Sequence, residues 1–311
     1  MTKSAKAFAP AAISSFFEIH DPNKGKTFSN LVRIGARGGG FGLEKGVETK
    51  VTIQESKGQS IDVFINSKIA LEAKTTRTVV QNLMNMAGLR SGVIVEHKIE
   101  VPIGSGFGTS AGGAITAGLA LKEALDLPLT CNQIGKIAHF AEIECNTGLG
   151  TVSSLTCCGG CVLVVEPGAP GVCRIDSIPI SPNHMVVCGF VNSKVSKEPI
   201  LSSLEKKTQI NKYGKQTMKA ILANPTLKNF LDSCWVFSQN VGFATEITCK
   251  LVESAKEAGA VGAAQNMIGE AVHALVLEEN APAVAEAFKR VLPSQQVIVS
   301  RIDFQGARLT K

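Results

Sequence analysis

The sequence predicts a mixed α+β protein built from two domains. Its 311 residues are about twice the usual length of one domain. Hydrophobic residues make up 44% of the chain and charged residues only 19%, which excludes a disordered protein or an acidic tail. Helical and strand-like patterns are grouped in both halves instead of alternating strictly, which favours α+β layers. Composition changes over residues 179–183, so we place the domains at 1–181 and 182–311.

The N-terminal half combines short strands with helices. Its strand candidates show apolar–polar alternation or a short apolar run, and they cover residues 47–53, 61–65, 92–96, 98–101 and 161–166. Its helix candidates cover residues 76–87, 109–125 and 132–145. Gly88 is expected to end the first helix, Pro128 stops the second, and Thr130 is the expected N-cap of the third.

The C-terminal half is richer in helices. Strands are expected over residues 185–191 and 296–301, and residues 261–268 are small and apolar. The helix candidates cover residues 206–222, 226–240, 244–258 and 281–291. The first of them is basic, with Lys212, Lys215 and Lys219 on one face, which indicates either a solvated surface or steering of an anionic substrate.

Composition also bounds the partners and the compartment. The net charge is only +6, no block of five like charges occurs, and aromatic residues are 5% of the chain, so no nucleic-acid partner is expected. Apolar runs are shorter than the roughly 20 residues of a spanning helix, so no membrane partner is expected. Pro10 and two serines interrupt the run over residues 7–17, which disfavours a signal peptide.

The cysteines indicate a reducing compartment. Their number, nine, is odd and their positions are scattered, which is typical of reduced thiols in a cytoplasmic protein. Cys158 and Cys161 have a spacing that could hold zinc. A second pair is missing, so a core strand is the favoured interpretation.

The segment from Pro102 to Ala114 is the most informative in the chain. Three glycines alternate with other residues and lead into Thr-Ser at the expected start of a helix. Glycine permits positive φ and close approach of the backbone, and the first N–H groups of a helix favour an anion. The sequence therefore predicts a phosphate-binding loop, whose candidate residues are Pro102, Gly104, Gly106, Gly108, Thr109, Ser110 and Ala111.

Other readings of this segment are weaker. A P-loop needs a lysine that is missing here, and the dinucleotide fingerprint needs glycine where Thr109 stands. A glycine hinge that serves packing alone is the remaining alternative. Each glycine costs on the order of 0.5–1 kcal/mol relative to alanine, which makes three of them costly without a ligand.

Two further segments carry candidate site residues. Arg37 lies in a run of five glycines over residues 33–42, where its guanidinium could bind a carboxylate or phosphate; a mobile surface loop is the alternative. His139 and Glu142 are three residues apart on one helix face. Glu142 is a candidate Mg²⁺ ligand together with Ser110, and an ordinary His–Glu pair is the alternative.

Several segments of the sequence, spread over most of its length, together resemble a known family. Residues 102–114 resemble the second motif of the GHMP kinases, the superfamily of galactokinase, homoserine kinase, mevalonate kinase and phosphomevalonate kinase. Residues 7–17 stand where that superfamily has its first motif, and 259–269 look like a divergent third motif. More closely, the chain is similar to the archaeal pantoate kinases, through stretches over residues 35–42, 147–150, 159–160, 167–171, 210–214 and 225–242.

The resemblance implies a fold and a reaction. The N-terminal domain would be like the second domain of ribosomal protein S5 and the C-terminal domain ferredoxin-like. The protein would use ATP to phosphorylate pantoate to 4-phosphopantoate for coenzyme A biosynthesis. ATP phosphates would lie on residues 102–111, Ser110 and Glu142 would bind Mg²⁺, and His139 would meet the substrate. The family's substrate arginine is missing here, so Arg37 or a lysine is the candidate to bind the substrate carboxylate. A homodimer is a candidate assembly.

Two departures from the family pattern leave the reaction open. Thr151 stands where the pantoate kinases have an aspartate that matches the catalytic base, and Leu163 stands where they offer an arginine to the substrate. These departures are compatible with an enzyme that needs no base, a kinase of another alcohol or hydroxy acid such as a mevalonate derivative or homoserine, or a weak nucleotide-binding relative.

Overall fold

The larger of two sheets forms the body of the N-terminal part. The computed structural model describes residues 3–21, 31–54, 58–157, 159–191 and 203–311. Strands follow the order β12-β1-β2-β5-β3-β4, with β6 pairing with β2 and β7 pairing with β6. Their bounds are β1 Ser4–His20, β2 Gly35–Gln54, β3 Ser60–Ile65, β4 Lys68–Ile69, β5 Gly92–Ile99, β6 Cys161–Glu166, β7 Arg174–Ile178 and β12 Arg308–Thr310.

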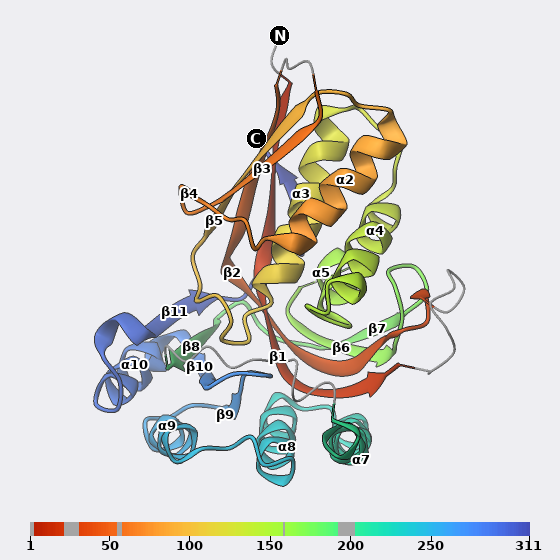
Figure 1. Cartoon of the computed structure of the whole chain (residues 1–311). Helices are drawn as coiled ribbons and strands as arrows, with labels where there is room; N and C mark the ends of the chain where they lie inside the picture. Colours follow the sequence, from red (N-terminus) through yellow and green to blue (C-terminus); the bar gives the residue numbers. More distant parts are fainter. Residues whose placement is uncertain (1–2, 22–30, 55–57, 158, 192–202) are drawn as a thin grey trace.

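Helices cover one face of this sheet. They are α2 Lys74–Ala87, α3 Thr109–Ala124, α4 Cys131–Glu144 and α5 Thr151–Cys157. Helix α3 is the central one: it packs on β1 and β2 and lies against α2 and α4 (Figure 1). Most of its buried residues are small, so that Gly112 packs against Val47 of β2 and Gly118 against Ile134 of α4. The small-residue run in the sequence therefore serves close helix–sheet packing.

Strands β1 and β2 form a long antiparallel pair with irregularities. The pairing shifts register between Pro10 and Ala11 and again between Ser14 and Phe16. The backbones approach so closely that a Cβ at Gly40 would lie 1.7 Å from the carbonyl oxygen of Ile13. The alternative of a mobile surface loop for the glycine run is therefore wrong for its described part, because Gly35–Gly42 is paired with β1, and its middle also with β6.

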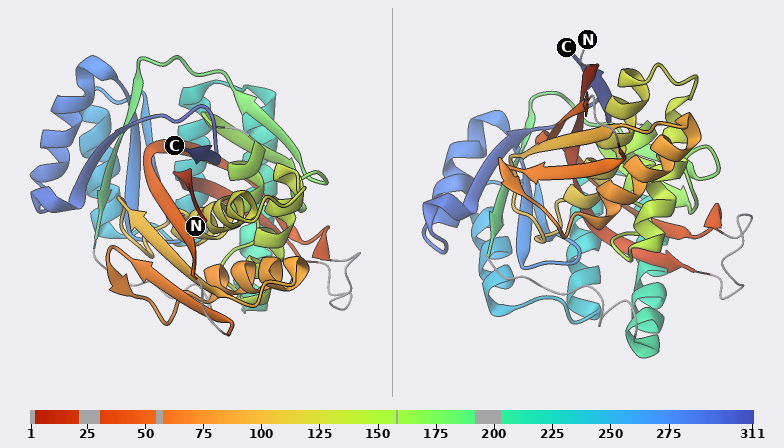
Figure 2. Two further views of the ribbon diagram at one scale, coloured as in Figure 1. Left: turned by 90° about the horizontal axis from the view of Figure 1, so that it is seen from above. Right: turned by 45° about the horizontal axis from the view of Figure 1, so that its top comes forward.

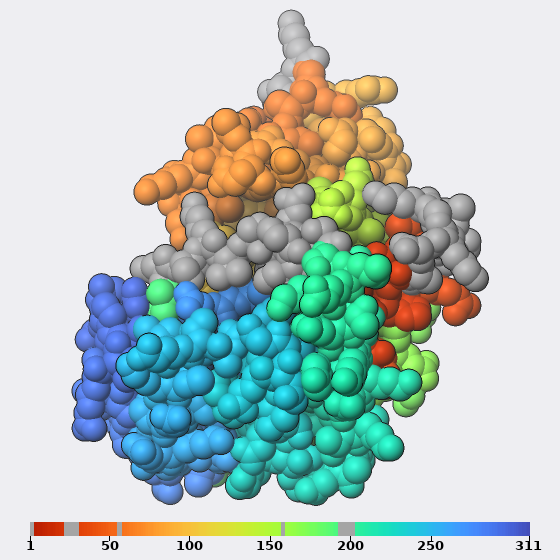
Figure 3. Space-filling view, turned by 60° about the horizontal axis from the view of Figure 1, so that its bottom comes forward, coloured from red at the N-terminus to blue at the C-terminus, as the bar shows by residue number. Residues whose placement is uncertain are grey.

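A four-stranded antiparallel sheet carries the C-terminal part. Its order is β11-β8-β10-β9, with bounds β8 His184–Phe190, β9 Gly262–Gln265, β10 Ala271–Leu277 and β11 Val297–Arg301. The helices of this part are α7 Leu204–Ala223, α8 Leu227–Asn240, α9 Glu246–Glu257 and α10 Ala281–Lys289. Figure 3 shows α7, α8 and α9 side by side on one face of the molecule. Lys212, Lys215 and Lys219 are exposed on α7.

The end of the chain returns to the first sheet. Strand β12 pairs with β1, with Lys6 opposite Thr310, so the two ends of the chain lie side by side (Figure 2). Arg308 stacks over Phe8 and forms an ion pair with Asp303 at 2.8 Å. The division into domains 1–181 and 182–311 stays a prediction.

The sequence patterns predicted most of these elements. Thr130 caps α4 in a capping box with Gln133, and Gly88 ends α2 in a left-handed conformation. The strand candidates 92–96 and 98–101 are one strand, β5. Strands β1, β4, β7, β9, β10 and β12 and helix α5 were not predicted. Helix α5 has seven residues, too few for a helical period to be recognisable.

The structure bears on the predictions about a membrane span, about the apolar run over residues 7–17 and about zinc at Cys158 and Cys161. None of the helices in the described ranges is long and apolar enough to cross a membrane. Residues 7–17 lie within β1, where most side chains are buried. Cys161 is buried in β6, and burial raises the pKa of its thiol, whereas Cys158 lies outside the described residues. Among the described residues, no group of three His, Cys, Asp or Glu side chains could hold a metal ion.

Candidate functional site

The phosphate loop, residues 102–108, has the backbone geometry expected of an anion-binding turn. Gly104, Gly106 and Gly108 all have positive φ, at +88°, +80° and +64°. Gly108 is the N-cap of α3, and no side chain caps the helix. The N–H groups of the first helical turn lack partners within the helix. The loop and the start of α3 therefore present backbone donors at the positive end of a helix dipole.

Ser110 and Glu142 are joined by a chain of hydroxyl contacts. The Ser110 hydroxyl lies 3.4 Å from that of Thr75, which lies 2.9 Å from the hydroxyl of Thr147. The Thr147 hydroxyl and N–H both donate to the backbone carbonyl of Glu142, at 3.4 and 2.9 Å. Helices α2, α3 and α4 and the turn after α4 thus link the Ser110 hydroxyl to the backbone of Glu142.

Gly148 gives the Glu142 carboxylate its space. Glu142 is 2% exposed, and a Cβ at Gly148 would lie 2.4 Å from its Oε2 atom. Any side chain at position 148 would therefore displace the carboxylate. The turn over residues 147–150 consequently shapes the space around the Glu142 carboxylate.

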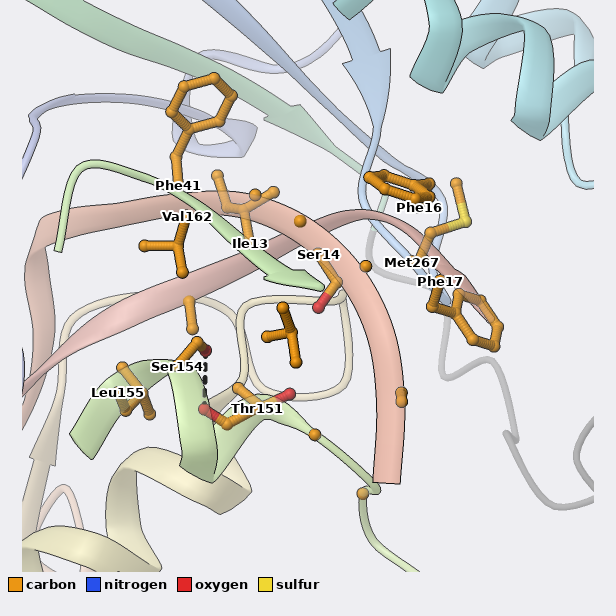
Figure 4. Close-up of a pocket in the computed structure, with 18 of the residues that line it drawn as sticks. Ile13, Ser14, Phe16, Phe17, Phe41, Thr151, Ser154, Leu155, Val162 and Met267 are labelled. Atoms are coloured by element: carbon orange, nitrogen blue, oxygen red, sulfur yellow. Dashed lines mark hydrogen bonds between the residues drawn. The ribbon is translucent and has the colours of Figure 1, made fainter. Parts of the chain in front are cut away.

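A pocket lies between the curved β1–β2 pair and the start of α5. Figure 4 shows Ser14 and Thr151 at this pocket, with Val162 and Leu155 beside them. The Ser154 hydroxyl donates to the Thr151 carbonyl at 2.9 Å. Most of the wall is apolar, and the polar side chains that line it are those of Ser14, Arg37, Thr147, Thr151 and Ser154.

The phosphate loop borders this pocket. A Cβ at Gly108 would lie 2.9 Å from the carbonyl oxygen of Ala12 and 2.9 Å from Cγ2 of Thr151, and both residues line the pocket. The Ala12 N–H donates to the Phe107 carbonyl at 3.0 Å. A molecule in the pocket would therefore lie next to an anion held by the loop.

Arg37 supplies positive charge at the pocket. Its Nη1 atom forms an ion pair with Glu18 at 2.9 Å, and its Nε donates to the Val165 carbonyl at 3.0 Å. These contacts hold the guanidinium in one place. Among the described residues that line the pocket, Arg37 is the one basic side chain.

His139 lies behind the pocket and not on its surface. Its ring is 1% exposed, and Nε2 donates to the Ile34 carbonyl at 3.0 Å. Burial lowers the pKa of His139 to about 4, so the ring is neutral at physiological pH. This hydrogen bond connects the His139 side chain to Ile34, the residue that precedes β2. The substrate role predicted for it stays a prediction.

Thr151 and Leu163 differ in their access to the pocket. Thr151 is the first residue of α5 and lines the pocket. Leu163 is 2% exposed and packs in the apolar core near Gly39, on the far side of β6 from the pocket residues Val162 and Val164. Thr75, Thr147, Ser14 and Ser154 were not predicted as site residues, because single hydroxyl residues carry no recognisable spacing.

Known proteins are similar to this chain in sequence and in fold. Residues 74–160 match the family model described as the GHMP kinases N terminal domain. This chain contains a GHMP kinase N-terminal domain. The matched segment includes Ser110, Glu142 and the phosphate loop, and the resemblance predicted from the sequence is confirmed.

Curated relatives and a solved structure extend the similarity over nearly the whole chain. A pantoate kinase of Methanocaldococcus jannaschii is 29% identical over 272 residues, which cover 88% of this chain and 93% of the relative. A pantoate kinase of Thermococcus kodakarensis is 28% identical over 284 residues, 89% of each chain. A structure described as a phosphotransferase related to the CoA biosynthesis pathway has a TM-score of 0.84 at 24% identity, over 99% of this chain and 98% of the other. The predicted α+β fold of the GHMP kinases is confirmed.

Proposed function

We propose that this protein is a small-molecule kinase that transfers the γ-phosphoryl group of ATP to the C4 hydroxyl of pantoate. The observation that carries the proposal is the position of the phosphate loop, whose last glycine borders a small pocket lined by apolar walls and one arginine. The pantoate kinases among the relatives support the choice of acceptor.

The residues at the loop fit the phosphates of ATP and a magnesium ion. Three glycines in positive φ and an uncapped helix start suit phosphate oxygens. Mg²⁺ is usually bound by one or two carboxylates together with substrate phosphates, so the Glu142 carboxylate and the Ser110 hydroxyl are a sufficient protein contribution. When bound, the ion neutralises charge on the phosphates.

The residues at this site could catalyse the reaction by positioning the acceptor hydroxyl and by stabilising charge on the phosphates, without a general base. No aspartate, glutamate or histidine is among the described residues that line the pocket, and Thr151 cannot act as a general base near neutral pH. Phosphoryl transfer proceeds through a loose transition state in most analyses, which demands little deprotonation of the attacking hydroxyl. The chain would therefore act by aligning the hydroxyl with the γ-phosphorus.

The pocket also fits the chemistry of pantoate, which has a carboxylate and two methyl groups on one carbon. The walls formed by Phe16, Val162 and Met267 suit the methyl groups. Arg37 would bind the carboxylate in place of an arginine at position 163. A charge-assisted contact of this kind is stronger than a neutral hydrogen bond.

Thr151 and Leu163 leave one alternative acceptor class open, another small alcohol or hydroxy acid. Leu163 is buried in the core and cannot bind a carboxylate. A mevalonate derivative or homoserine carries a carboxylate as well, so either would also need a cation such as Arg37. The two departures therefore count against the pantoate kinase pattern and do not select between these acceptors.

The test is ADP release by the purified protein with Mg-ATP and pantoate, mevalonate or homoserine. We expect release with pantoate alone to exceed the background. Release only with another acceptor would replace pantoate, and ATP binding with no turnover on any acceptor would indicate a nucleotide-binding relative.

The role of Arg37 has its own test. Arg37→Gln should raise the KM for pantoate by about tenfold or more, because a desolvated charge-assisted contact is lost. Arg33→Gln is the matched control, since Arg33 is exposed and does not line the pocket. An unchanged KM for pantoate in Arg37→Gln would remove the assignment.

A further inference from the structure

The turn between β9 and β10 lies between strand β1 and the phosphate loop. The Met267 N–H donates to the Ser14 carbonyl at 2.7 Å. On the other side, a Cβ at Gly106 would lie 2.9 Å from the Cβ of Asn266, and a Cβ at Gly269 would lie 2.9 Å from the carbonyl carbon of Ser105. The turn therefore touches the backbone of the phosphate loop directly, with Asn266 against Gly106.

Three buried polar side chains connect this turn to both sheets. The Ser15 hydroxyl lies 2.9 Å from Nε2 of His273, and Nδ1 of His273 lies 2.8 Å from Oδ1 of Asn266. All three residues are 0% exposed. Ser15 belongs to β1 and His273 to β10. We call these contacts the Ser15–His273–Asn266 relay.

The protonation state of His273 suits the relay. Burial lowers the pKa of His273 to about 3, so the ring is neutral in the working pH range. A neutral imidazole has one donor and one acceptor nitrogen. With Nδ1 donating to the Asn266 oxygen, Nε2 accepts from the Ser15 hydroxyl, and both contacts are satisfied. The plane of the Asn266 amide is thereby fixed.

Stability alone does not explain Asn266. Among the described residues, its Nδ2 atom is buried and has no hydrogen-bond partner. A buried donor without a partner destabilises the folded state, and an apolar side chain of similar size would avoid that loss. The amide therefore calls for a role in the site that it touches.

We propose that Asn266 is a positioning residue for nucleotide binding: the relay fixes its side chain against Gly106 and so holds the phosphate loop in its anion-binding shape. This inference rests on the ATP-dependent function proposed above. It adds Asn266 and His273, from the C-terminal part, to a phosphate loop whose other candidate residues come from the N-terminal part.

The experiment is calorimetric titration of Mg-ATP into the wild type, three single variants, one double variant and a control variant. We expect Asn266→Ala and His273→Phe to raise the Kd about tenfold, which corresponds to about 1.4 kcal/mol, and Ser15→Ala to raise it less. The double variant Ser15→Ala/His273→Phe should bind no more weakly than His273→Phe alone, because both changes interrupt one relay. The KM for pantoate should stay within about twofold in Asn266→Ala.

Val276→Ala is the matched control. Val276 is buried on the same strand as His273 but belongs to the core cluster on the other face of the sheet, with Val272 and Ala274. It should lower the melting temperature without changing the Kd for Mg-ATP. Should His273→Phe fail to fold, Asn266→Ala and Ser15→Ala carry the test.

Two results would overturn the inference. One is a Kd for Mg-ATP within twofold of the wild type in both Asn266→Ala and His273→Phe. The other is a Val276→Ala protein that binds Mg-ATP as weakly as the relay variants. Because the titration needs no acceptor, a wild type that binds Mg-ATP without phosphorylating pantoate contradicts the proposed acceptor and leaves the relay standing.

Discussion

Alanine at position 108 would test whether the end of the phosphate loop needs glycine. Gly108 has φ +64°, and a Cβ there would lie 2.9 Å from the Ala12 carbonyl oxygen and from Cγ2 of Thr151. Gly88, at the end of α2, has φ +63°, and a Cβ there would meet nothing within 4 Å. Gly88→Ala is therefore a matched control for backbone strain without a clash.

Both variants place a Cβ on a residue with a left-handed backbone conformation, but only Gly108→Ala also creates a steric clash. A left-handed conformation costs a residue with a Cβ about 1–2 kcal/mol. Only Gly108→Ala must also shift the backbone, because its Cβ would be too close to a carbonyl oxygen in β1. That shift moves the start of α3, where we expect the phosphates to bind. A misplacement of about 1 Å in a site can reduce the rate on the order of 100-fold.

The assay is steady-state ADP release with varied ATP at saturating pantoate, together with thermal unfolding. We expect kcat/KM for ATP to fall about 10- to 100-fold in Gly108→Ala and to remain near the wild-type value in Gly88→Ala. Both variants should melt at a lower temperature. The reasoning is refuted if Gly108→Ala keeps kcat/KM for ATP within twofold of Gly88→Ala.

The remaining predictions concern the metal ligands, the missing base and pH. Ser110→Ala and Glu142→Ala should each lower kcat at least about tenfold, measured at saturating Mg²⁺, because each removes an oxygen ligand; unchanged turnover in both would remove the site assignment. Thr151→Asp should raise kcat if the base limits the rate, and an active wild type that this change does not affect would show that the base is not limiting. Burial lowers the pKa of His97 and of His139 to about 4, below the unfolded value of 6.5. Their contribution to stability is therefore present above pH 6.5 and is lost as the pH falls toward 4, so the melting temperature should drop across that window. His97→Gln should make the drop smaller, and an identical pH profile in that variant would contradict the assignment to His97.

Patterned elements of the fold were predictable from the sequence, and long-range geometry was not. Thr130 and Gly88 marked helix ends because caps are local features. The glycine run over Gly35–Gly42 gives no strand pattern, because its glycines serve the close approach of β1. Only the folded chain shows that requirement.

The same holds for the candidate site, in which contiguous residues were predictable and residues far apart in sequence were not. The phosphate loop was visible because its glycines, Thr109 and Ser110 are contiguous. Thr75 and Thr147, which connect Ser110 to Glu142, are far apart in sequence and meet only through packing of α2, α3 and α4. The Ser15–His273 contact joins residues 258 positions apart, which no local pattern in one sequence indicates.

The most direct test of the proposed reaction is detection of the product by phosphorus NMR. Wild-type protein with Mg-ATP and pantoate should produce a phosphomonoester signal that grows in step with ADP, and Ser110→Ala should suppress both. Equal ADP formation with and without pantoate, with no phosphomonoester signal, would contradict phosphoryl transfer to pantoate.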